Sequence, residues 1–358
     1  MYNMKGLFYI GLMLLLLLAG CDKVDAGRGE DDGRVYPVSF TLAGFMETRA
    51  DGDGENALKA GDTLMIAAYD PNPPRALVAA GQYKVNSSAN GLELVSGQDS
   101  MYLPVGTYDF CAMTPKQTLT GNGNYGTVGQ GVDALGSVTQ AQMGATSTPV
   151  VLKDLDHLAS QISFIVQVVP QKLDSVASFA VQTIEIGGMV ASKENNYLLP
   201  DNLLEIPETG AADRFETLTI GGTDAFTTGD KGTGAGPGFI NTQKTPLIVF
   251  PKAASTFNAV IEVKIKKAQA AALDTGSGTE GEEETINLNA KINRLAFEPG
   301  KRYKFEVNYG WDYVRFDITT ADWTTVKDGS QVGDGEQTVS HEIKIGQWDD
   351  DINLDMTI

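Results

Sequence analysis

Two cysteines and one arginine are the side chains of this sequence whose positions suit covalent chemistry. Cys21 closes an apolar run, Leu7–Ala19, where its thiol could be alkylated. Cys111 lies in an alternating apolar segment and is expected to be a small buried side chain, so no disulfide is predicted. Arg49 lies in the polar, glycine-rich segment Thr48–Asn56, and exposed loops of this kind are where trypsin-like proteases cut.

Catalysis and metal binding have weaker support. The sequence contains no GxSxG, HExxH, CxxC or GxxxxGK[ST] motif, so neither an enzyme nor a cofactor is predicted. The acidic groups at Asp51–Glu55 and Asp349–Asp351 could hold Ca²⁺ through oxygen, but they lack EF-hand spacing and fit solvated turns better. We expect His157 to hydrogen-bond to backbone at a domain junction rather than to bind metal.

The first 34 residues are typical of an export signal followed by a tether. Residues 1–21 carry Lys5 and an apolar run shorter than the ~20 residues that a membrane-spanning helix needs. The run ends in Leu18-Ala19-Gly20-Cys21, which resembles the lipobox of bacterial lipoproteins, whose cysteine is acylated; an ordinary signal peptide is the alternative. In the tether, residues 22–34, Glu30–Asp32 resembles surface-export signals of Bacteroidetes lipoproteins, or is a solvated linker. We expect lipidation at Cys21 and an outer-membrane location.

The amino-acid composition limits the number of domains and the classes of ligand that can be expected. The chain has 358 residues, of which 42% are hydrophobic, and a formal net charge of −19. This length suggests two domains, each with enough chain to bury a core. Because nucleic-acid binding needs clustered Lys and Arg, an acidic chain of this kind is not expected to bind it.

After Gly33 the hydrophobic pattern has a period of two, which is typical of half-buried strands. Turn-forming residues separate the short apolar runs, so we predict antiparallel β-sandwiches at residues 35–154 and 155–358. Thr118–Thr148 is predicted to be a loop and Lys264–Leu273 two or three turns of helix. The predicted strands are Tyr36–Leu42, Thr63–Tyr69, Thr107–Met113, Gln161–Val169, Phe179–Ile186, Leu218–Ile220, Leu247–Phe250, Asn258–Ile265, Thr285–Ile292, Arg302–Asn308 and Tyr313–Ile318.

Several segments, taken in order, resemble one family. Met101–Pro115 (MYLPVGTYDFCAMTP), Leu155–Val166 (LDHLASQISFIV), Phe297–Val307 (FEPGKRYKFEV) and Ile318–Trp323 (ITTADW) are similar to conserved runs of Mfa-like fimbrillins. Thr48-Arg49-Ala50 resembles the TRA sequence of their precursors. The resemblance implies two tandem transthyretin-like, Greek-key β-sandwich domains and a subunit of the type V pili of Bacteroidetes, with other fimbrial subunits as partners.

The resemblance also implies assembly by strand exchange. Cleavage between Arg49 and Ala50 would release the first strand together with Cys21 and its lipid. In that strand the apolar side chains that alternate onto one face are Tyr36, Val38, Phe40 and Leu42. A neighbouring subunit would then fill the vacant edge with its own strand.

The carboxyl terminus has the character of such a donor strand. Residues 352–358 alternate regularly, and Val339, Ile343 and Ile345 form a less regular strand before them. The predicted donor side chains are Ile352, Leu354, Met356 and Ile358. The alternative is that this strand pairs within its own sandwich.

Other functions stay open at this point. The protein could be a non-polymerising anchor that keeps its lipid, or a tip adhesin with a host or bacterial surface ligand. A surface glycan-binding lipoprotein is a different class, and its best aromatic platform would be Trp311 beside Tyr309 and Tyr313. Packing explains these three aromatics equally well, and we expect Trp323 and Trp348 to fill the core or a groove.

Overall fold

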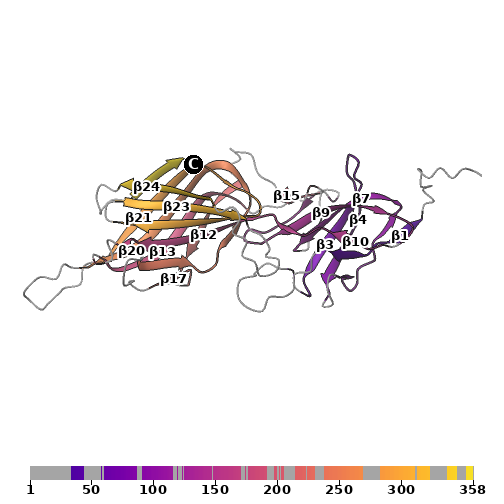
Figure 1. Ribbon diagram of the computed structural model, residues 1–358, viewed down its shortest axis with the longest axis horizontal. Helices are drawn as coiled ribbons and strands as arrows, with labels where there is room; N and C mark the ends of the chain where they lie inside the picture. The colour runs from indigo at the N-terminus through magenta and orange to yellow at the C-terminus, as the bar shows by residue number, and fades with distance from the viewer. Residues whose placement is uncertain are drawn as a thin grey trace, which may run out of the picture.

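The fold is built from β-strands. A computed structural model describes residues 34–43, 60–86, 91–115, 125–146, 148–170, 176–191, 197–199, 203–204, 214–222, 224–229, 238–268, 283–310, 313–322, 337–344 and 352–357, together with residues 58, 119, 123, 174 and 201. No α-helix occurs among these residues, and the prediction of an all-β chain is confirmed. Figure 1 shows two bodies, each built of sheets, lying end to end along the long axis.

The N-terminal body has two layers. One layer is a six-stranded antiparallel sheet, in the order β11 (Asp156–His157), β9 (Leu135–Met143), β7 (Gly106–Thr114), β3 (Thr63–Tyr69), β4 (Leu77–Val85) and β5 (Leu92–Leu94). The other layer consists of two short pairs, β1 (Val35–Pro37) with β6 (Tyr102–Pro104) and β2 (Phe40–Leu42) with β10 (Val150–Leu152). Buried apolar side chains from both layers form one core cluster.

The C-terminal body is a sandwich of two larger sheets. The first follows the order β17 (Phe226–Thr228), β18 (Gly238–Gln243), β12 (Ser160–Val168), β22 (Lys301–Tyr309), β23 (Tyr313–Asp322) and β24 (Gln337–Lys344), and β19 (Leu247–Val249) also pairs with β12. The second follows the order β16 (Phe215–Gly221), β13 (Val176–Val190), β20 (Lys252–Lys267), β21 (Glu283–Phe297) and β25 (Ile352–Thr357).

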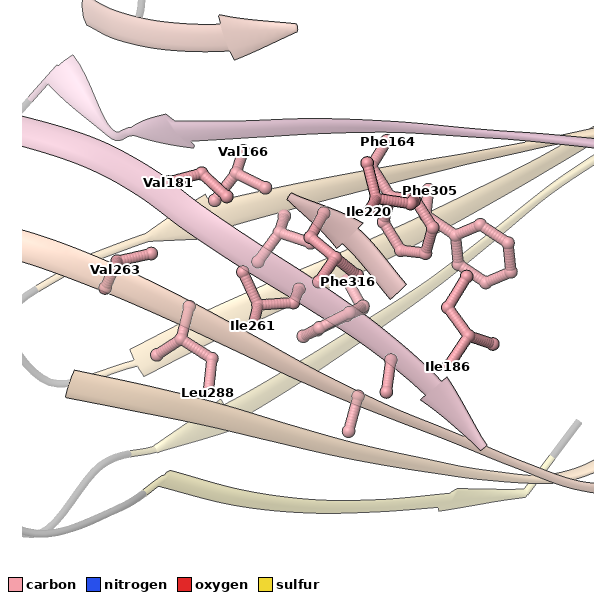
Figure 2. Close-up of a cluster of buried hydrophobic side chains, with 14 of the residues drawn as sticks. Phe164, Val166, Val181, Ile186, Ile220, Ile261, Val263, Leu288, Phe305 and Phe316 are labelled. Atoms are coloured by element: carbon pink, nitrogen blue, oxygen red, sulfur yellow. The ribbon is translucent and has the colours of Figure 1, made fainter. Parts of the chain in front are cut away.

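Alternation along the strands fills the space between these two sheets. Every second residue of β12 from Ser160 to Val168 is buried, and β20 and β21 follow the same period over most of their length. Figure 2 shows labelled side chains from both sheets meeting in this layer. At its centre the Phe305 ring stacks with Phe164 and with Phe257, each at a centroid distance of 5.0 Å. This packing accounts for the strong period of two in the sequence.

The predicted helix at Lys264–Leu273 is wrong over its first four residues, because Lys264–Lys267 belong to β20. Its neighbours β13 and β21 pair with this end of the strand, and Val263 and Ile265 are buried on one face. Lys264 and Lys267 reach across to carboxylates of β21. Pairing on both sides outweighs the helix propensity of this lysine-rich segment. The rest of the predicted helix, from Gln269, lies outside the described residues.

The predicted loop at Thr118–Thr148 is also wrong in part, because it contains β9. The polar composition of β9 hides the alternation of apolar side chains by which a strand is predicted from sequence. Ser137 and Thr139 are buried, and their hydroxyls bond to backbone groups of Lys153: the Ser137 hydroxyl donates to the carbonyl (3.2 Å), and the Thr139 hydroxyl accepts from the N–H (2.9 Å). Satisfied hydroxyls can take core positions that apolar side chains usually hold.

The predicted antiparallel pairing holds for most but not all strands. The pairs β2–β10, β12–β22 and β21–β25 are parallel. Parallel neighbours need a long crossover between them, and in each pair the two strands are far apart in the sequence. Local turn signals cannot reveal such pairing.

The chain passes from one body to the other near residues 158–159. Strand β11 ends at His157 and pairs with β9, whereas β12 begins at Ser160 in the second body. A small three-stranded sheet also joins the two bodies, since β8 (Tyr125–Gly126) pairs with β14 (Tyr197–Leu198), which pairs with β15 (Leu203–Leu204). The domain division at residues 154 and 155 stays a prediction.

Buried tyrosine hydroxyl and cysteine thiol groups make the stability of the fold sensitive to high pH. Burial raises the pKa of Tyr83 and of Cys111 to about 12, and it raises the pKa values of Tyr69 and Tyr309 as well. Above about pH 9 the unfolded chain therefore loses protons that the folded chain retains.

We expect the free energy of unfolding to fall as the pH rises from about 9 to about 12, as measured by urea unfolding. The Tyr83→Phe variant should lose about 2 kcal/mol less stability over this range, because it lacks one of the shifted groups. Equal losses in the variant and the unaltered chain would contradict this assignment.

Candidate strand-exchange site

The first described segment of the chain, residues 34–43, is the middle strand of the second layer in the N-terminal body; we call it the insert. Its first half, β1, runs antiparallel to β6, with Tyr36 opposite Leu103. Its second half, β2, runs parallel to β10, with Phe40 opposite Val150. The insert thus joins two strands that, among the described residues, belong to no other sheet.

The insert changes partner between Val38 and Ser39. The Val38 N–H donates to the Met101 carbonyl on the β6 side at 2.9 Å. The Ser39 carbonyl accepts from the Val150 N–H at 2.8 Å, and the Ala43 N–H donates to the Leu152 carbonyl at 2.9 Å. One short strand therefore satisfies the edges of two neighbours at once.

The side chains of the insert alternate between core and solvent. Val38, Phe40 and Leu42 are buried, with exposed fractions of 7%, 2% and 6%. Tyr36 is half-buried, and Ser39 is exposed. The structure thus places three of the four predicted strand side chains in the core, with Tyr36 at its margin. Their release from the protein stays a prediction.

Phe40 is the main anchor of the insert. Its ring meets Tyr83 edge to face at 5.1 Å and Phe110 edge to face at 5.4 Å. Tyr83 lies on β4 and Phe110 on β7, so this one ring connects the insert to the opposite sheet. Edge-to-face pairs of this kind each add about 0.5–1.5 kcal/mol beyond the burial of apolar area.

Removal of the insert would leave an acceptor groove. The facing edges of β6 and β10 would then carry backbone groups that have lost their partners. The groove would be lined by apolar side chains, because the buried Leu103 of β6 and Leu152 of β10 lie beside the insert and the buried Phe110 of β7 packs against Phe40 from the opposite sheet. Unpaired edges beside apolar pockets are what an added strand needs.

The carboxyl-terminal strand lies in the C-terminal body. β25 runs parallel to β21, from Ile352 opposite Leu288 to Thr357 opposite Asn293, at the edge of its sheet. β24 holds the corresponding edge of the other sheet, antiparallel to β23. In the isolated chain the predicted donor residues 352, 354 and 356 therefore pair within their own sandwich, which was the alternative; Ile358 lies outside the described residues.

The predicted covalent sites lie outside the described part of the chain. This holds for Cys21, Arg49 and Ala50, and for both acidic segments considered for Ca²⁺. No helix within the described ranges has the length and apolar character needed to cross a membrane. Lipidation at Cys21 and cleavage after Arg49 stay predictions.

His157 and Tyr309, which were considered for metal and sugar binding, are buried side chains of the fold. His157 is buried, and its Nδ1 lies 2.8 Å from Asp133 Oδ1; its predicted hydrogen bond to backbone stays a prediction. Tyr309 is buried and its ring lies 5.6 Å from Phe179, so it is unable to serve as a sugar platform. Trp311 lies outside the described residues. Across the described positions, no cluster of His, Cys, Asp or Glu could hold a metal ion.

Sequence reasoning found the insert but predicted neither of its two neighbours as a strand. β10 follows the predicted loop, and its only signal was the apolar run Val150-Val151-Leu152 between a proline and a lysine. Such a run is too short for its period to be measured. β6 lies within the segment Met101–Pro115, where it precedes the turn before β7.

A family model described as Fimbrillin-like matches residues 48–323. The chain belongs to the fimbrillin-like family. The match begins at Thr48, immediately before Arg49, so the insert lies upstream of it and strands β24 and β25 lie downstream. Both elements considered for strand exchange thus flank the region that this fimbrillin-like protein shares with the family model.

Solved structures of bacterial proteins resemble this fimbrillin-like chain in part. A candidate cell adhesion protein from Bacteroides uniformis is 18% identical, with a TM-score of 0.49 over 83% of this chain and 100% of its own. One from Bacteroides ovatus is 15% identical, with a TM-score of 0.46 over 82% and 100% of the two chains. A candidate adhesin from Bacteroides thetaiotaomicron is 13% identical, with a TM-score of 0.40 over 74% and 89%. No curated protein matches the sequence.

The Phe40→Ala variant of the full chain should be destabilised by about 3–5 kcal/mol, because the substitution opens a cavity between the insert and the opposite sheet. Urea unfolding measures this loss. Ser39→Ala is the matched control, since the Ser39 side chain is exposed and only its backbone bonds to β10; it should change stability by less than about 0.5 kcal/mol. Similar values for the two variants would mean that the insert does not hold the layer together.

Proposed function

We propose that this fimbrillin-like protein is a structural subunit of a cell-surface fimbria, a type V pilus that supports adhesion and polymerises by donor-strand exchange. The subunit is exported as a lipoprotein acylated at Cys21 and held at the outer membrane. Cleavage between Arg49 and Ala50 then frees it from the lipid. The observation that carries the proposal is the position of the insert between two strands that have no other sheet partner among the described residues.

The place of the cleavage site supports this order of events. Arg49 follows the insert closely in the sequence, so a single cut after it separates the insert covalently from the rest of the body. The insert then remains only through its short ladders and its buried side chains. Once the peptide bond is cut, only non-covalent contacts hold the insert. Another strand with the same alternation of apolar side chains can then compete for these contacts and replace it.

The carboxyl-terminal tail of the next subunit has the same alternation of apolar side chains as the insert that it would replace. Ile352, Leu354, Met356 and Ile358 have the same spacing as Tyr36, Val38, Phe40 and Leu42. Burying four such side chains contributes roughly 6–12 kcal/mol before ordering costs, at about 1.5–3 kcal/mol each. The backbone ladders along β6 and β10 add to this. The partners are therefore other subunits of the same fibre, joined without covalent bonds.

Release of the tail from its own sheet is the corresponding cost. β25 occupies a sheet edge and has β21 as its one strand partner among the described residues. An edge strand held on one side loses fewer backbone bonds on leaving than a central strand does. In the groove the same tail would have β6 and β10 on its two sides.

Substitution of Arg49 should block maturation. In cells producing the Arg49→Gln protein, fimbrial material sheared from the surface should contain no subunit that begins at Ala50, because the bond after residue 49 no longer follows an arginine. Amino-terminal sequencing of the sheared fraction measures this. The matched control is Arg28→Gln, which removes another arginine upstream of the insert and should leave the Ala50 terminus unchanged. An unaltered protein that retains residues 1–49 in surface fibres would contradict the cleavage step.

Removal of residues 352–358 should give a folded monomer that no longer forms a ladder in electrophoresis without boiling. A milder pair of variants separates the two faces of the tail. Leu354→Asp places a charge among the donor side chains and should abolish the ladder, whereas Asp355→Asn on the other face should preserve it. A truncated chain that fails to fold would show that its own sandwich cannot release the tail, and the donor role would fail.

A further inference from the structure

The long connection between β13 and β16 of the C-terminal body carries a hairpin that lies on the N-terminal body. Its strands β14 and β15 pair with each other, Tyr197 opposite Leu204 and Leu198 opposite Leu203. β14 also pairs with β8, Tyr197 opposite Gly126 and Leu198 opposite Tyr125. In Figure 1, β15 lies between the two bodies. Backbone pairing thus crosses from one body to the other.

Apolar side chains of the hairpin enter a core cluster shared by the two bodies. Leu199 and Leu204 are each 5% exposed. They belong to a cluster that contains Tyr69 and Met113 of the N-terminal sheet and Phe250 of the C-terminal body. The hairpin therefore contributes buried area where the bodies meet.

An ionic contact adds a third link. One nitrogen of the Arg75 guanidinium donates to Asp201 of the hairpin at 2.6 Å, and the other donates to Asp109 of β7 at 2.9 Å. Gln140 of β9 donates to the second oxygen of Asp109 at 3.0 Å. The Asp109 carboxylate is largely buried, and because Gln140 holds its Oδ1, its Oδ2 holds the guanidinium in a fixed position.

The turn before β4 presents Arg75 in an uncommon conformation. Its φ of +51° lies in the left-handed region, which few residues other than glycine adopt. The Arg75 N–H donates to the Asn72 carbonyl at 2.7 Å, and the Asp70 N–H donates to the Ala76 carbonyl at 3.0 Å, so the turn is closed on both sides. The surrounding bonds hold the arginine where it can reach both carboxylates.

We propose that the β14–β15 hairpin is a clamp that fixes the two bodies as one rigid unit. Strand pairing to β8, the two leucines and the Arg75–Asp201 pair all restrain the same joint. The consequence for a fibre rests on the proposed function, because the acceptor groove lies in one body and the donor tail in the other. A fixed joint sets the angle between successive subunits and transmits tension from groove to tail.

Distance measurement by electron spin resonance tests the clamp on the monomeric full chain. Labels are placed at Thr107 of β7 and Thr285 of β21, which are both exposed, in a Cys21→Ala background; Cys111 is buried and takes no label. The clamp predicts a single narrow distribution of distances. That narrow distribution should be lost in a hairpin variant that combines Leu199→Ser, Asp201→Asn and Leu204→Ser.

The matched control changes the same side-chain types within one body. Leu218→Ser combined with Asp224→Asn removes a half-buried leucine and the exposed Asp224–Lys244 ion pair of the C-terminal body, and it should keep the distribution narrow. A hairpin variant as narrow as the control, or an unaltered chain that is already broad, would overturn the clamp. Loss of strand signal in the hairpin variant would overturn it too, since the hairpin would then be needed for folding.

This test separates the clamp from the proposed function. It uses monomers, so it gives the same result whether or not the protein forms fibres. If the ladder in electrophoresis is absent while the distances behave as expected, the fibre proposal fails and the clamp stands. If the ladder forms while the distances are broad, the clamp fails and the fibre proposal stands.

Discussion

Pairing of backbone N–H and C=O groups between neighbouring strands is the constraint on which this structure depends. Each buried strand edge needs a partner, because an unpaired backbone group away from water costs free energy. In the N-terminal body, two short strands, β6 and β10, have their pairing supplied by one insert between them. This arrangement makes the layer dependent on the first segment that the structure describes.

The two bodies differ in how firmly their strands are held. In the C-terminal body, long strands such as β13, β20 and β21 pair over many residues, and stacked rings of Phe164, Phe257 and Phe305 fill the core. In the second layer of the N-terminal body each ladder covers three residues. The layer therefore depends on side-chain anchors such as Phe40 more than on backbone pairing.

The sequence was sufficient to predict the all-β class and most of the long strands, because their side chains alternate with a clear period of two. It also located the insert, whose four apolar residues alternate in the same way. It did not reveal β9, whose buried Ser137 and Thr139 look like loop residues, nor that Lys264–Lys267 extend a strand. Strand order stayed out of reach, since the parallel pairs β2–β10 and β12–β22 join distant segments through tertiary packing alone.

The change of partner at Val38 and Ser39 has a consequence for the pathway by which the layer opens. β6 holds the first half of the segment, and β10 holds the second half together with a bridge from Thr41 to Gly91, so the bonds to β6 can break while those to β10 are still intact. The insert can then detach in several steps, each with a small free-energy barrier, instead of in one cooperative step. In the proposed strand exchange, an incoming chain would pair from the freed end while the insert is still leaving, so that the apolar groove would stay covered throughout.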